Sequence, residues 1–491
     1  MPYKHGAYGE LIETTQQIST LSQGTIPVYI GTAPVHRLLE PSKSVNVPLL
    51  INNLDEAKTK LGYSDNDKFE DFTLSAAVYA HFKNKIQPIG PIVVINVLDP
   101  SKHVSEITSS SVIIANKAGY IDDYVVLDSV IISDFEEGTD YKEEYTSDGK
   151  LKLTIINSEI ASPVSVSYKK INVVEVENAD IIGSYDPLTD KRTGLSCVNT
   201  VYEDLNVVPS VISVPGWNHI LEVETEIVAL CAEIGGHWKA TCVTDIDPDI
   251  KTIDEAKLWK AQHNYINKIE KVCWPKVELN GKSIWMSIMT IVRMQQTDFS
   301  NAGVPHESCS NKQIDITGVL FRDSSRTRFT QEQGNKLNEK GISTVIFSGG
   351  KWVIWGPHMA NYEYGITESN TSHYGEIFDV NIRTNIYLSN DFQLRNAQLI
   401  DSPIARNDLD GILNTEQMRL NSLIADGKLL YGKIQFISSE NQVGDIAQGN
   451  FIFDTAVTNT PPAKSLTNRI QYTSEGINRL IEGDENNEDK Q

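Results

Sequence analysis

Two uninterrupted apolar runs, each stopped by turn-forming residues, constrain the fold of this chain more than any other feature. The first covers Ile26 to Ile30 and ends at Gly31, and the second covers Ile92 to Leu98 and ends at Asp99-Pro100. A strand that is apolar at every position is buried on both faces, which is typical of a parallel sheet covered by helices. The two runs therefore predict a layered α/β fold.

Helical signals lie between and after these runs. Asn53 stands three residues before Glu56, as in a helix N-terminal cap, and Gly62 supplies the matching C-terminal stop. A second helix is predicted over 72–82. The same signals return after residue 200, and they predict a strand over 207–214, helices over 223–234 and from Thr252 and Thr330, a hairpin over 342–355, and a helix through Phe378, Ile382 and Ile386.

The stretch from about 101 to 200 has a different pattern. Apolar and polar residues alternate at 151–155 and at 164–168, and Asp148-Gly149 is a hairpin-type turn between two β-prone runs. Alternation with period two predicts strands that are buried on one face only. We therefore expect a separate, β-rich domain inserted into the α/β core.

These patterns give a fold class and a domain order. We expect an α/β (α+β) core domain that is discontinuous in sequence, with a β-rich inserted domain and extended N- and C-terminal arms. The predicted order is an N-terminal arm over 1–24, the first part of the core over 25–100, the insertion over 101–200, the second part of the core over 201–462, and a C-terminal strand with an acidic tail over 463–491.

The two ends of the chain differ from the core. Residues 1–24 are polar and rich in Thr, Gln and Ser, whereas Pro461-Pro462 precedes a short segment in which apolar residues alternate. That segment contains Leu466, Asn468, Ile470 and Tyr472, and it is predicted to be a strand. An isolated strand cannot satisfy its own backbone groups, so it gains by joining the edge of another sheet.

Composition excludes several classes of protein. Lys plus Arg number 43 against 65 for Asp plus Glu, which gives a formal net charge of −22 and disfavours direct contact with nucleic acid or an anionic membrane surface. Five cysteines at irregular spacing make a disulfide framework improbable, and they fit synthesis in a reducing cytoplasm. The first residues lack the layout of a secretory signal, so we expect no export by the usual route.

Motifs for phosphate and calcium binding fail at required positions. Gly281-Lys282-Ser283 resembles the end of a phosphate-binding loop, but Lys276 stands where the first Gly is needed. Asp245 to Asp249 has the carboxylate spacing of a calcium loop, but Ile250 occupies the position of the turn-forming Gly. A solvated acidic loop is the better interpretation of the second pattern.

Catalytic and zinc motifs also fail. His306-Glu307 begins a zinc-protease pattern, but Ser310 replaces the second His, and no G-x-S-x-G occurs. Cys231, His237 and Cys242 lack a fourth zinc ligand, and we favour a structural role for them. Trp352 and Trp355 are more typical of packing than of a ligand platform. The residues therefore predict no catalytic residue, no cofactor and no metal, and they do not indicate an enzyme.

Several stretches, in this order along the chain, resemble the contractile tail sheath proteins of bacteriophages and phage-tail-like bacteriocins. They are Gly6-Ala7-Tyr8-Gly9-Glu10, Gly31-Thr32-Ala33-Pro34, 207–216, Trp274-Pro275 with Met294, Asp298 and Pro305, Ser308, Ser310-Asn311-Lys312 and Ile316-Thr317-Gly318, and 337–342 leading into Trp355-Gly356. The resemblance covers about 1–100 and 200–475. Cys309 departs from the usual sequence motif of the family at this position, and Arg383 is a single Arg where the family often has two.

The resemblance implies a mechanical function. In this family the terminal arms add strands to neighbouring cores, which implies inter-subunit strand exchange by Tyr8, Glu10, Ile12, Leu466, Asn468, Ile470 and Tyr472. It further implies a homo-oligomeric helical cylinder of stacked, hexameric rings around an inner tail tube, with baseplate and tail terminator proteins as partners. Such a cylinder contracts without nucleotide hydrolysis and drives the tube through a cell envelope, for genome ejection or as a bacteriocin. The implied location is the virion tail or bacteriocin particle, assembled in the cytoplasm of the bacterial host.

Two alternatives stay open from the residues alone. An α/β enzyme with an unrecognised site would gather His and carboxylate side chains in a concave pocket. Another self-assembling shell protein would form sheets or fibres instead of hollow tubes. The β-rich insertion is expected to face outward in a sheath, where it can vary without disturbing the linked cores.

Overall fold

The computed structural model of the chain describes residues 24–321, 323, 325–369 and 371–482. The chain divides into two units, Met1–Thr460 and Pro461–Gln491. Most of the predicted N-terminal arm, including Tyr8, Glu10 and Ile12, lies outside the described residues. Within those residues, none of the helices has the length and apolar character needed to cross a membrane.

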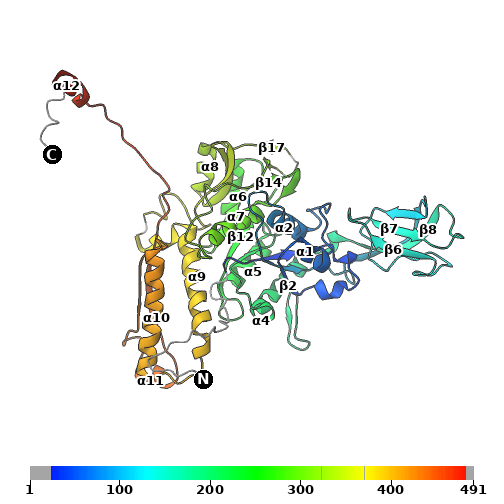
Figure 1. Cartoon of the computed structure of the whole chain (residues 1–491), viewed down its shortest axis with the longest axis horizontal. Helices are drawn as coiled ribbons and strands as arrows, with labels where there is room; N and C mark the ends of the chain where they lie inside the picture. The colour runs from blue at the N-terminus through cyan, green and yellow to red at the C-terminus, as the bar shows by residue number, and fades with distance from the viewer. Residues whose placement is uncertain (1–23, 322, 324, 370, 483–491) are drawn as a thin grey trace, which may run out of the picture. The chain divides into compact units, whose positions relative to one another are not determined.

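An eight-stranded sheet forms the centre of the first unit (Figure 1). Its inner strands are parallel, and its two edge strands are antiparallel to their neighbours. In spatial order the strands are β19 (Lys351–Trp355), β18 (Ile342–Ser348), β13 (Glu270–Cys273), β12 (Thr241–Asp245), β11 (Val211–Ser213), β1 (Pro27–Gly31), β3 (Ile92–Asn96) and β2 (Pro48–Ile51). The α/β class predicted from the apolar runs is confirmed.

The sheet separates two apolar clusters because side chains alternate along each strand. In β1, Val28 and Ile30 join one cluster and Tyr29 joins the other. Every residue of β1 and β3 is buried, which is why the sequence shows no alternation there.

Helices cover both faces of the sheet. They are α1 (Leu54–Leu61), α2 (Thr73–Phe82), α4 (Val201–Leu205), α5 (Leu221–Ala232), α6 (Ile253–Gln262), α7 (Met286–Ser300) and α8 (Gln331–Asn338). The predicted caps are confirmed, since the side chain of Asn53 accepts a hydrogen bond from Glu56 N and Gly62 takes a left-handed conformation with φ 71°. Thr252 and Thr330 cap α6 and α8 in the same way.

A smaller antiparallel sheet extends the core. Its strands, in spatial order, are β15 (Lys282–Ile284), β14 (Lys276–Leu279), β16 (Gly318–Leu320) and β17 (Arg326–Thr327). The sequence Gly281-Lys282-Ser283 lies at the turn from β14 into β15. These residues therefore belong to a β-hairpin and not to a phosphate-binding loop.

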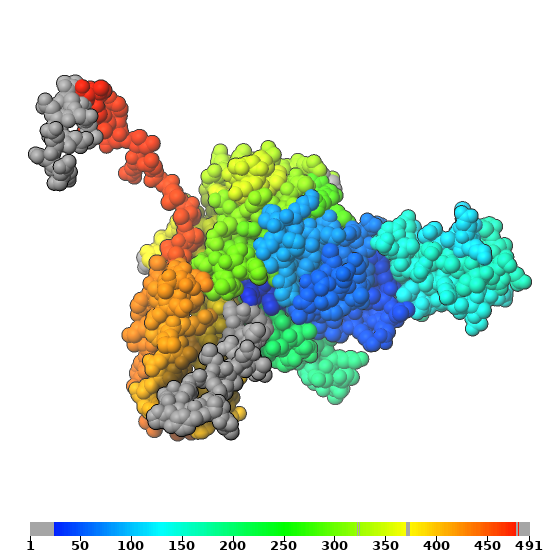
Figure 2. All heavy atoms as spheres, in the orientation of Figure 1, coloured from blue at the N-terminus to red at the C-terminus, as the bar shows by residue number. Residues whose placement is uncertain are grey.

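Residues 104–171 form β strands with a core of their own. The strands are β4 (Val104–Val112), β5 (Ala118–Ile121), β6 (Tyr141–Tyr145), β7 (Leu151–Ile155) and β8 (Val164–Ile171). Their buried side chains make one cluster, and in the space-filling view these residues gather in one lobe in cyan tones (Figure 2). The predicted turn at Asp148-Gly149 joins β6 to β7, with φ 85° at Gly149.

The β-rich part is shorter than the predicted 101–200. After Ile171 the chain forms α3 (Asn178–Ile182) and a small hairpin of β9 (Tyr185–Asp186) and β10 (Lys191–Arg192). Val176, Ile181 and Leu195 join an apolar cluster of the central sheet. The alternation of apolar and polar residues in 151–168 therefore predicted the strands correctly. Apolar residues after 171 pack instead on the core of the central sheet.

The end of the first unit is a layer of two helices and two strands. Its elements are α9 (Asp379–Asn396), α10 (Arg406–Ala425), β20 (Leu429–Gln435), α11 (Val443–Ala447) and β21 (Asp454–Asn459). The helix predicted through Phe378, Ile382 and Ile386 is confirmed as α9, which lies beside α10 (Figure 1).

The second unit, Pro461–Gln491, contains α12 (Glu475–Glu482). Residues 461–473 form no helix and no strand. The strand predicted over Leu466–Tyr472 is therefore not paired within the described chain, and α12 was not predicted.

Candidate assembly interface

The two-stranded sheet of β20 and β21 rests on α9 and α10. Leu429 and Ile434 of β20 are buried with Leu420 and Leu423 of α10. A Cβ atom on Gly432 would lie 3.1 Å from the Cβ of Leu420, so the absence of a side chain at Gly432 allows β20 to approach α10 closely. The sheet is therefore held on one face only.

Both outer edges of the β20–β21 sheet lack a partner strand within the described parts of the chain. The central sheet differs, because its edges are covered. Along β19, the backbone N–H of Asn311 donates to Ile354 O at 2.6 Å and that of Ile314 donates to Trp352 O at 3.0 Å. At β2, the Nζ of Lys60 donates to Leu50 O at 2.8 Å. An uncovered strand edge is a template for pairing with another chain.

A groove of about 400 Å³ runs beside β21. Its walls come from α9, α10 and β21, and its apolar side chains are Leu388, Phe392, Leu420, Phe453 and Val457. A strand added to the free edge of β21 would lie over α9, so its side chains would face this groove. The groove and the open edge together form a site that can accept an alternating strand.

Ion pairs tie α9 to α10 beneath the groove. Arg395 of α9 donates to Glu416 of α10, with 3.1 Å from Nε to Oε1, and it also pairs with Asp391. Arg419 of α10 pairs with the same Asp391 carboxylate. Asp391 and Glu416 are buried, so these charge-assisted bonds fix the two helices in one arrangement.

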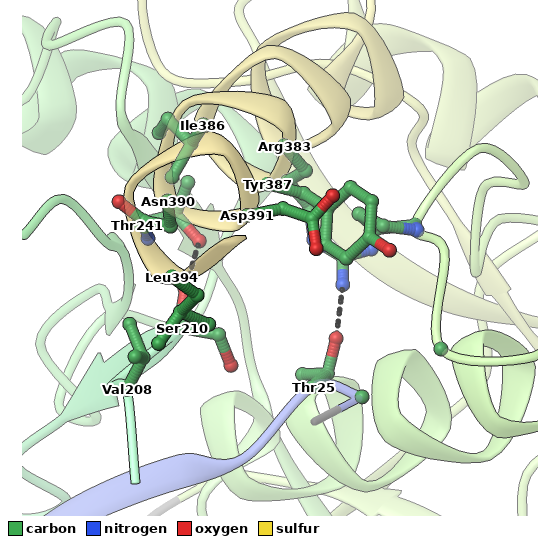
Figure 3. A pocket seen from close by; sticks show the side chains of 13 residues that line it. Thr25, Val208, Ser210, Thr241, Arg383, Ile386, Tyr387, Asn390, Asp391 and Leu394 are labelled. Carbon is green, nitrogen blue, oxygen red and sulfur yellow. Dashed lines mark hydrogen bonds between the residues drawn. The ribbon is translucent and has the colours of Figure 1, made fainter. Parts of the chain in front are cut away.

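The described chain begins at an anchored position next to α9. The Thr25 hydroxyl donates to the buried carboxylate of Asp298, and Arg383 of α9 pairs with the same carboxylate. Arg383 also donates to Thr25 Oγ1 at 3.2 Å (Figure 3). Burial raises the pKa of Asp298, and the Arg383 guanidinium opposes that rise. The predicted arm therefore leaves the core from a fixed point.

The C-terminal segment presents its apolar side chains to solvent. Leu466 and Ile470 are each 89% exposed and Tyr472 is 81% exposed, and Asn468 is exposed as well. These four residues share one face of an extended chain because they are two positions apart. Burial against another surface would remove that apolar area from water.

The sequence drew attention to the alternating segment Leu466–Tyr472, but it gave no signal for the open edges of the β20–β21 sheet. The sequence of β20, Leu429 to Gln435, carries a buried residue at Leu429, Gly432 and Ile434, and Gly432 breaks the period of two. The partner of Arg383 is Asp298, 85 positions away, and no local pattern signals such a pair.

Residues considered for other chemistry are placed in structural roles. Asp245 is buried and accepts hydrogen bonds from Ser287 N at 2.8 Å and from Asn218 at 3.1 Å, so it is not a solvated loop residue as predicted. Its carboxylate fixes the start of α7 instead. Cys231 and Cys242 are buried, as expected, whereas His237 is exposed beside Gln393.

Comparisons with known proteins agree with this architecture. No protein-family model matches the chain. The tail sheath protein of Burkholderia phage BcepMu is 24% identical over 516 residues, which cover 98% of this chain and 99% of the relative. The major tail sheath protein of Serratia phage KSP20 is 20% identical over 289 residues, which cover 58% of this chain and 68% of the relative.

Two solved structures share the fold. A chain of the anti-feeding prophage baseplate has a TM-score of 0.55 at 13% identity and covers 96% of this chain and 100% of its own length. A chain of the contracted PVC sheath complex, from an extracellular contractile injection system, has a TM-score of 0.55 at 12% identity. The match covers 96% of this chain and 99% of that one. In sequence, the chain is a homologue of the tail sheath proteins of these two phages.

Proposed function

We propose that this protein is the subunit of a contractile tail sheath that polymerises helically around a rigid inner tube and contracts to drive that tube through a cell envelope. The observation that carries the proposal is the match between an open two-stranded edge with an apolar groove and a terminal segment that exposes an alternating apolar face. One subunit therefore supplies both a donor and an acceptor for strand exchange.

The exchanged strand is Leu466–Tyr472 of one subunit on the free edge of β21 of the next. Backbone hydrogen bonds give this contact its strength, and the side chains of Leu466, Ile470 and Tyr472 fill the groove between α9 and β21. The N-terminal arm, with Tyr8, Glu10 and Ile12, supplies a second link, for which the other open edge at β20 is available. Subunits linked in this way stay joined while they rotate.

The assembled form is a cylinder of stacked hexameric rings. Its partners are the inner tail tube, the baseplate and the tail terminator protein, in a virion tail or bacteriocin particle assembled in the host cytoplasm. The net charge of −22 disfavours direct contact with nucleic acid or membrane. Residues 104–171 face outward from the cylinder, because they have a core of their own.

Contraction is a one-way change of a metastable cylinder and uses no enzymatic step. If each subunit gains about 3 kcal/mol of interface free energy, a cylinder of about a hundred subunits releases about 300 kcal/mol. Many small local changes therefore sum to a large mechanical stroke.

Negative-stain electron microscopy of the purified chain tests this function. We expect hollow cylinders of constant width as protein concentration or crowding increases. Flat sheets or solid fibres would favour a different shell protein, and a monomer under all salt and crowding conditions would contradict the proposal.

A further inference from the structure

The β-rich insertion (residues 104–171) and the core meet around the side chain of His36. His36 follows β1 in the core and has no exposed surface. The centre of its ring lies 5.6 Å from that of Phe72 in the core. It lies 5.7 Å and 5.8 Å from the ring centres of Tyr124 and Tyr145 in the insertion. The two parts of the chain therefore share one aromatic contact, with a histidine at its centre.

Neither ring nitrogen of His36 has a hydrogen-bond partner among the described residues. Buried polar side chains are normally hydrogen-bonded, so an unpaired one calls for a functional explanation. An apolar ring would fill the same site without leaving polar atoms unpaired. What imidazole adds is a nitrogen that takes up a proton between about pH 5 and pH 8.

The charged groups near this contact leave a protonated ring without a counter-charge. Those carried by the segments packed around it are Arg37, Asp67, Lys68, Asp71, Asp123 and Glu143. Asp67 is paired with Arg37 at 2.6 Å, Asp71 accepts from the Tyr124 hydroxyl at 2.6 Å, and Asp123 is paired with Lys170 at 2.7 Å. Burial raises the pKa of Glu143 to about 8, so this carboxyl is largely uncharged at lower pH. Burial, together with the charge of Arg37, accordingly lowers the pKa of His36 well below its ordinary value.

The backbone of the insertion is bonded to His36 itself. The N–H of Leu127 donates to His36 O at 2.9 Å, whereas the N–H of the neighbouring Val126 donates to Lys169 O at 2.9 Å within the insertion. The side chain of Val126 packs on a core cluster, and that of Leu127 packs on the cluster of the insertion. The hydrogen bond of Leu127 therefore spans the contact, and its amide reports whether the contact is closed.

A groove of about 300 Å³ borders this contact. Its walls include Arg37 and Asp67 of the core and Asp123 and Gly149 of the insertion. The insertion is therefore not packed on the core along this side, which leaves room for it to turn once the contact around His36 opens.

We propose that His36 is a pH-sensitive latch, which holds the insertion on the core while its ring is neutral and releases the insertion when the ring is protonated. In the open state the ring is in water, where the pKa of His is about 6.5. Opening therefore takes up one proton, so the latch is fully closed above about pH 6.5 and the open fraction rises about tenfold for each pH unit below it. In a sheath, release would let the outward lobe turn while the linked cores stay in place, and that consequence rests on the proposed function.

Hydrogen–deuterium exchange of the full-length monomer, resolved to single amides from about pH 5 to about pH 8, tests the latch. The amide of Leu127 is the reporter and that of Val126 is the internal reference. The test variant is His36→Phe, which keeps an aromatic ring and cannot be protonated. The matched control is His103→Gln, because His103 is a second histidine at the base of the insertion and its Nε2 already lies 3.3 Å from Asp180.

After correction for intrinsic exchange rates, the protection of Leu127 should fall about tenfold for each pH unit below about 6.5 in the wild type and in His103→Gln. It should be independent of pH in His36→Phe, and Val126 should stay protected in all three proteins. A flat response in the wild type, or the same fall in His36→Phe, would overturn the proposal.

Two further readouts keep the test decisive. Equal loss of protection in β1 and β3 would overturn the latch, because the whole core would then be opening. If His36→Phe does not fold, His36→Met replaces it, since Met is also apolar and adapts to irregular sites. Cylinder formation plays no part in these measurements, so failure of the latch and failure of the proposed function are separate results.

Discussion

The Nζ of Lys271 lies 2.8 Å from Oδ2 of Asp379 in a fully buried site, where it joins the central sheet to the first residue of α9. Lys271 also donates to Gly356 O at 2.8 Å and His358 O at 3.1 Å, and Ser308 donates to Asp379. All of the charge in this site is therefore paired. The position of α9, and with it the groove beside β21, depends on this contact.

Removing one member of the pair should be costly. We expect Lys271→Met to lower the free energy of unfolding by about 3–5 kcal/mol, because it leaves the Asp379 carboxylate buried without its cation. Urea denaturation of the monomer measures this change. Lys271→Met combined with Asp379→Asn should recover part of the loss, and an unchanged stability in the single variant would show that the pair does not hold α9.

The stability of the core should fall as pH rises, because of Glu270. Burial, with a further contribution from the carboxylate of Glu224, raises the pKa of Glu270 to about 8. Among the described residues, its buried Oε2 has no hydrogen-bond partner. Between these two values, the folded state therefore binds a proton that the unfolded state, in which the pKa of Glu is about 4.3, has released. This contribution is fully present below about pH 4 and is lost as pH rises toward about 8.

The variant Glu270→Gln tests whether Glu270 causes the fall in stability with rising pH. The amide keeps the shape of the side chain and cannot ionise, so the variant should be more stable than the wild type at pH 9 and should lose the decline between pH 5 and pH 8. Chemical denaturation at a series of pH values measures both effects. A decline of the same size in the variant would assign the pH dependence to other groups.

The close approach of β20 to α10 should be sensitive to side-chain size. Gly432→Val adds atoms where a Cβ already lies 3.1 Å from Leu420, and overpacking of this kind costs about 1–3 kcal/mol. We expect displacement of β20 and weaker cylinder assembly, measured by sedimentation. Gly444→Val is the control, because no atom in the described part of the chain lies within 4 Å of its added Cβ. Equal assembly of the two variants would contradict this role of Gly432.

A charge on the apolar face of the C-terminal segment should block assembly. Ile470→Asp places a carboxylate where the proposed strand meets the groove, whereas Gln471→Asp places it on the opposite face. Each factor of ten in the concentration needed for assembly corresponds to about 1.4 kcal/mol. We expect an increase of at least roughly tenfold for Ile470→Asp and little change for Gln471→Asp, with unaltered monomer stability in both. Equal effects would indicate a general charge effect.

The sequence predicts best those elements whose signal is local. Asn53 and Thr252 predict the starts of α1 and α6, and the apolar runs predict β1 and β3. These signals are local, because a helix cap and a buried strand are each specified by a few consecutive residues. Helix α7 gave no comparable signal. Nearly all of its residues, from Met286 to Asp298, are buried, so the apolar stripe of a surface helix is absent.

The candidate interface was predictable only in part. Alternation at Leu466, Ile470 and Tyr472 predicted a strand, but this segment forms no strand among the described residues. The proposed acceptor edge depends on Gly432 and on the pairing of α9 with α10, which are tertiary features. The burial of Arg383 against Asp298 is likewise a contact between distant positions.

Electron microscopy of two truncated chains tests the central claim most directly. One lacks residues 1–20 and the other ends at Pro462, and both keep the described core up to Thr460. We predict that each folds as a monomer with a cooperative unfolding transition and forms no cylinders under conditions in which the full chain does. Normal cylinders from either truncated chain would contradict the claim that the ends of each subunit complete the sheets of its neighbours.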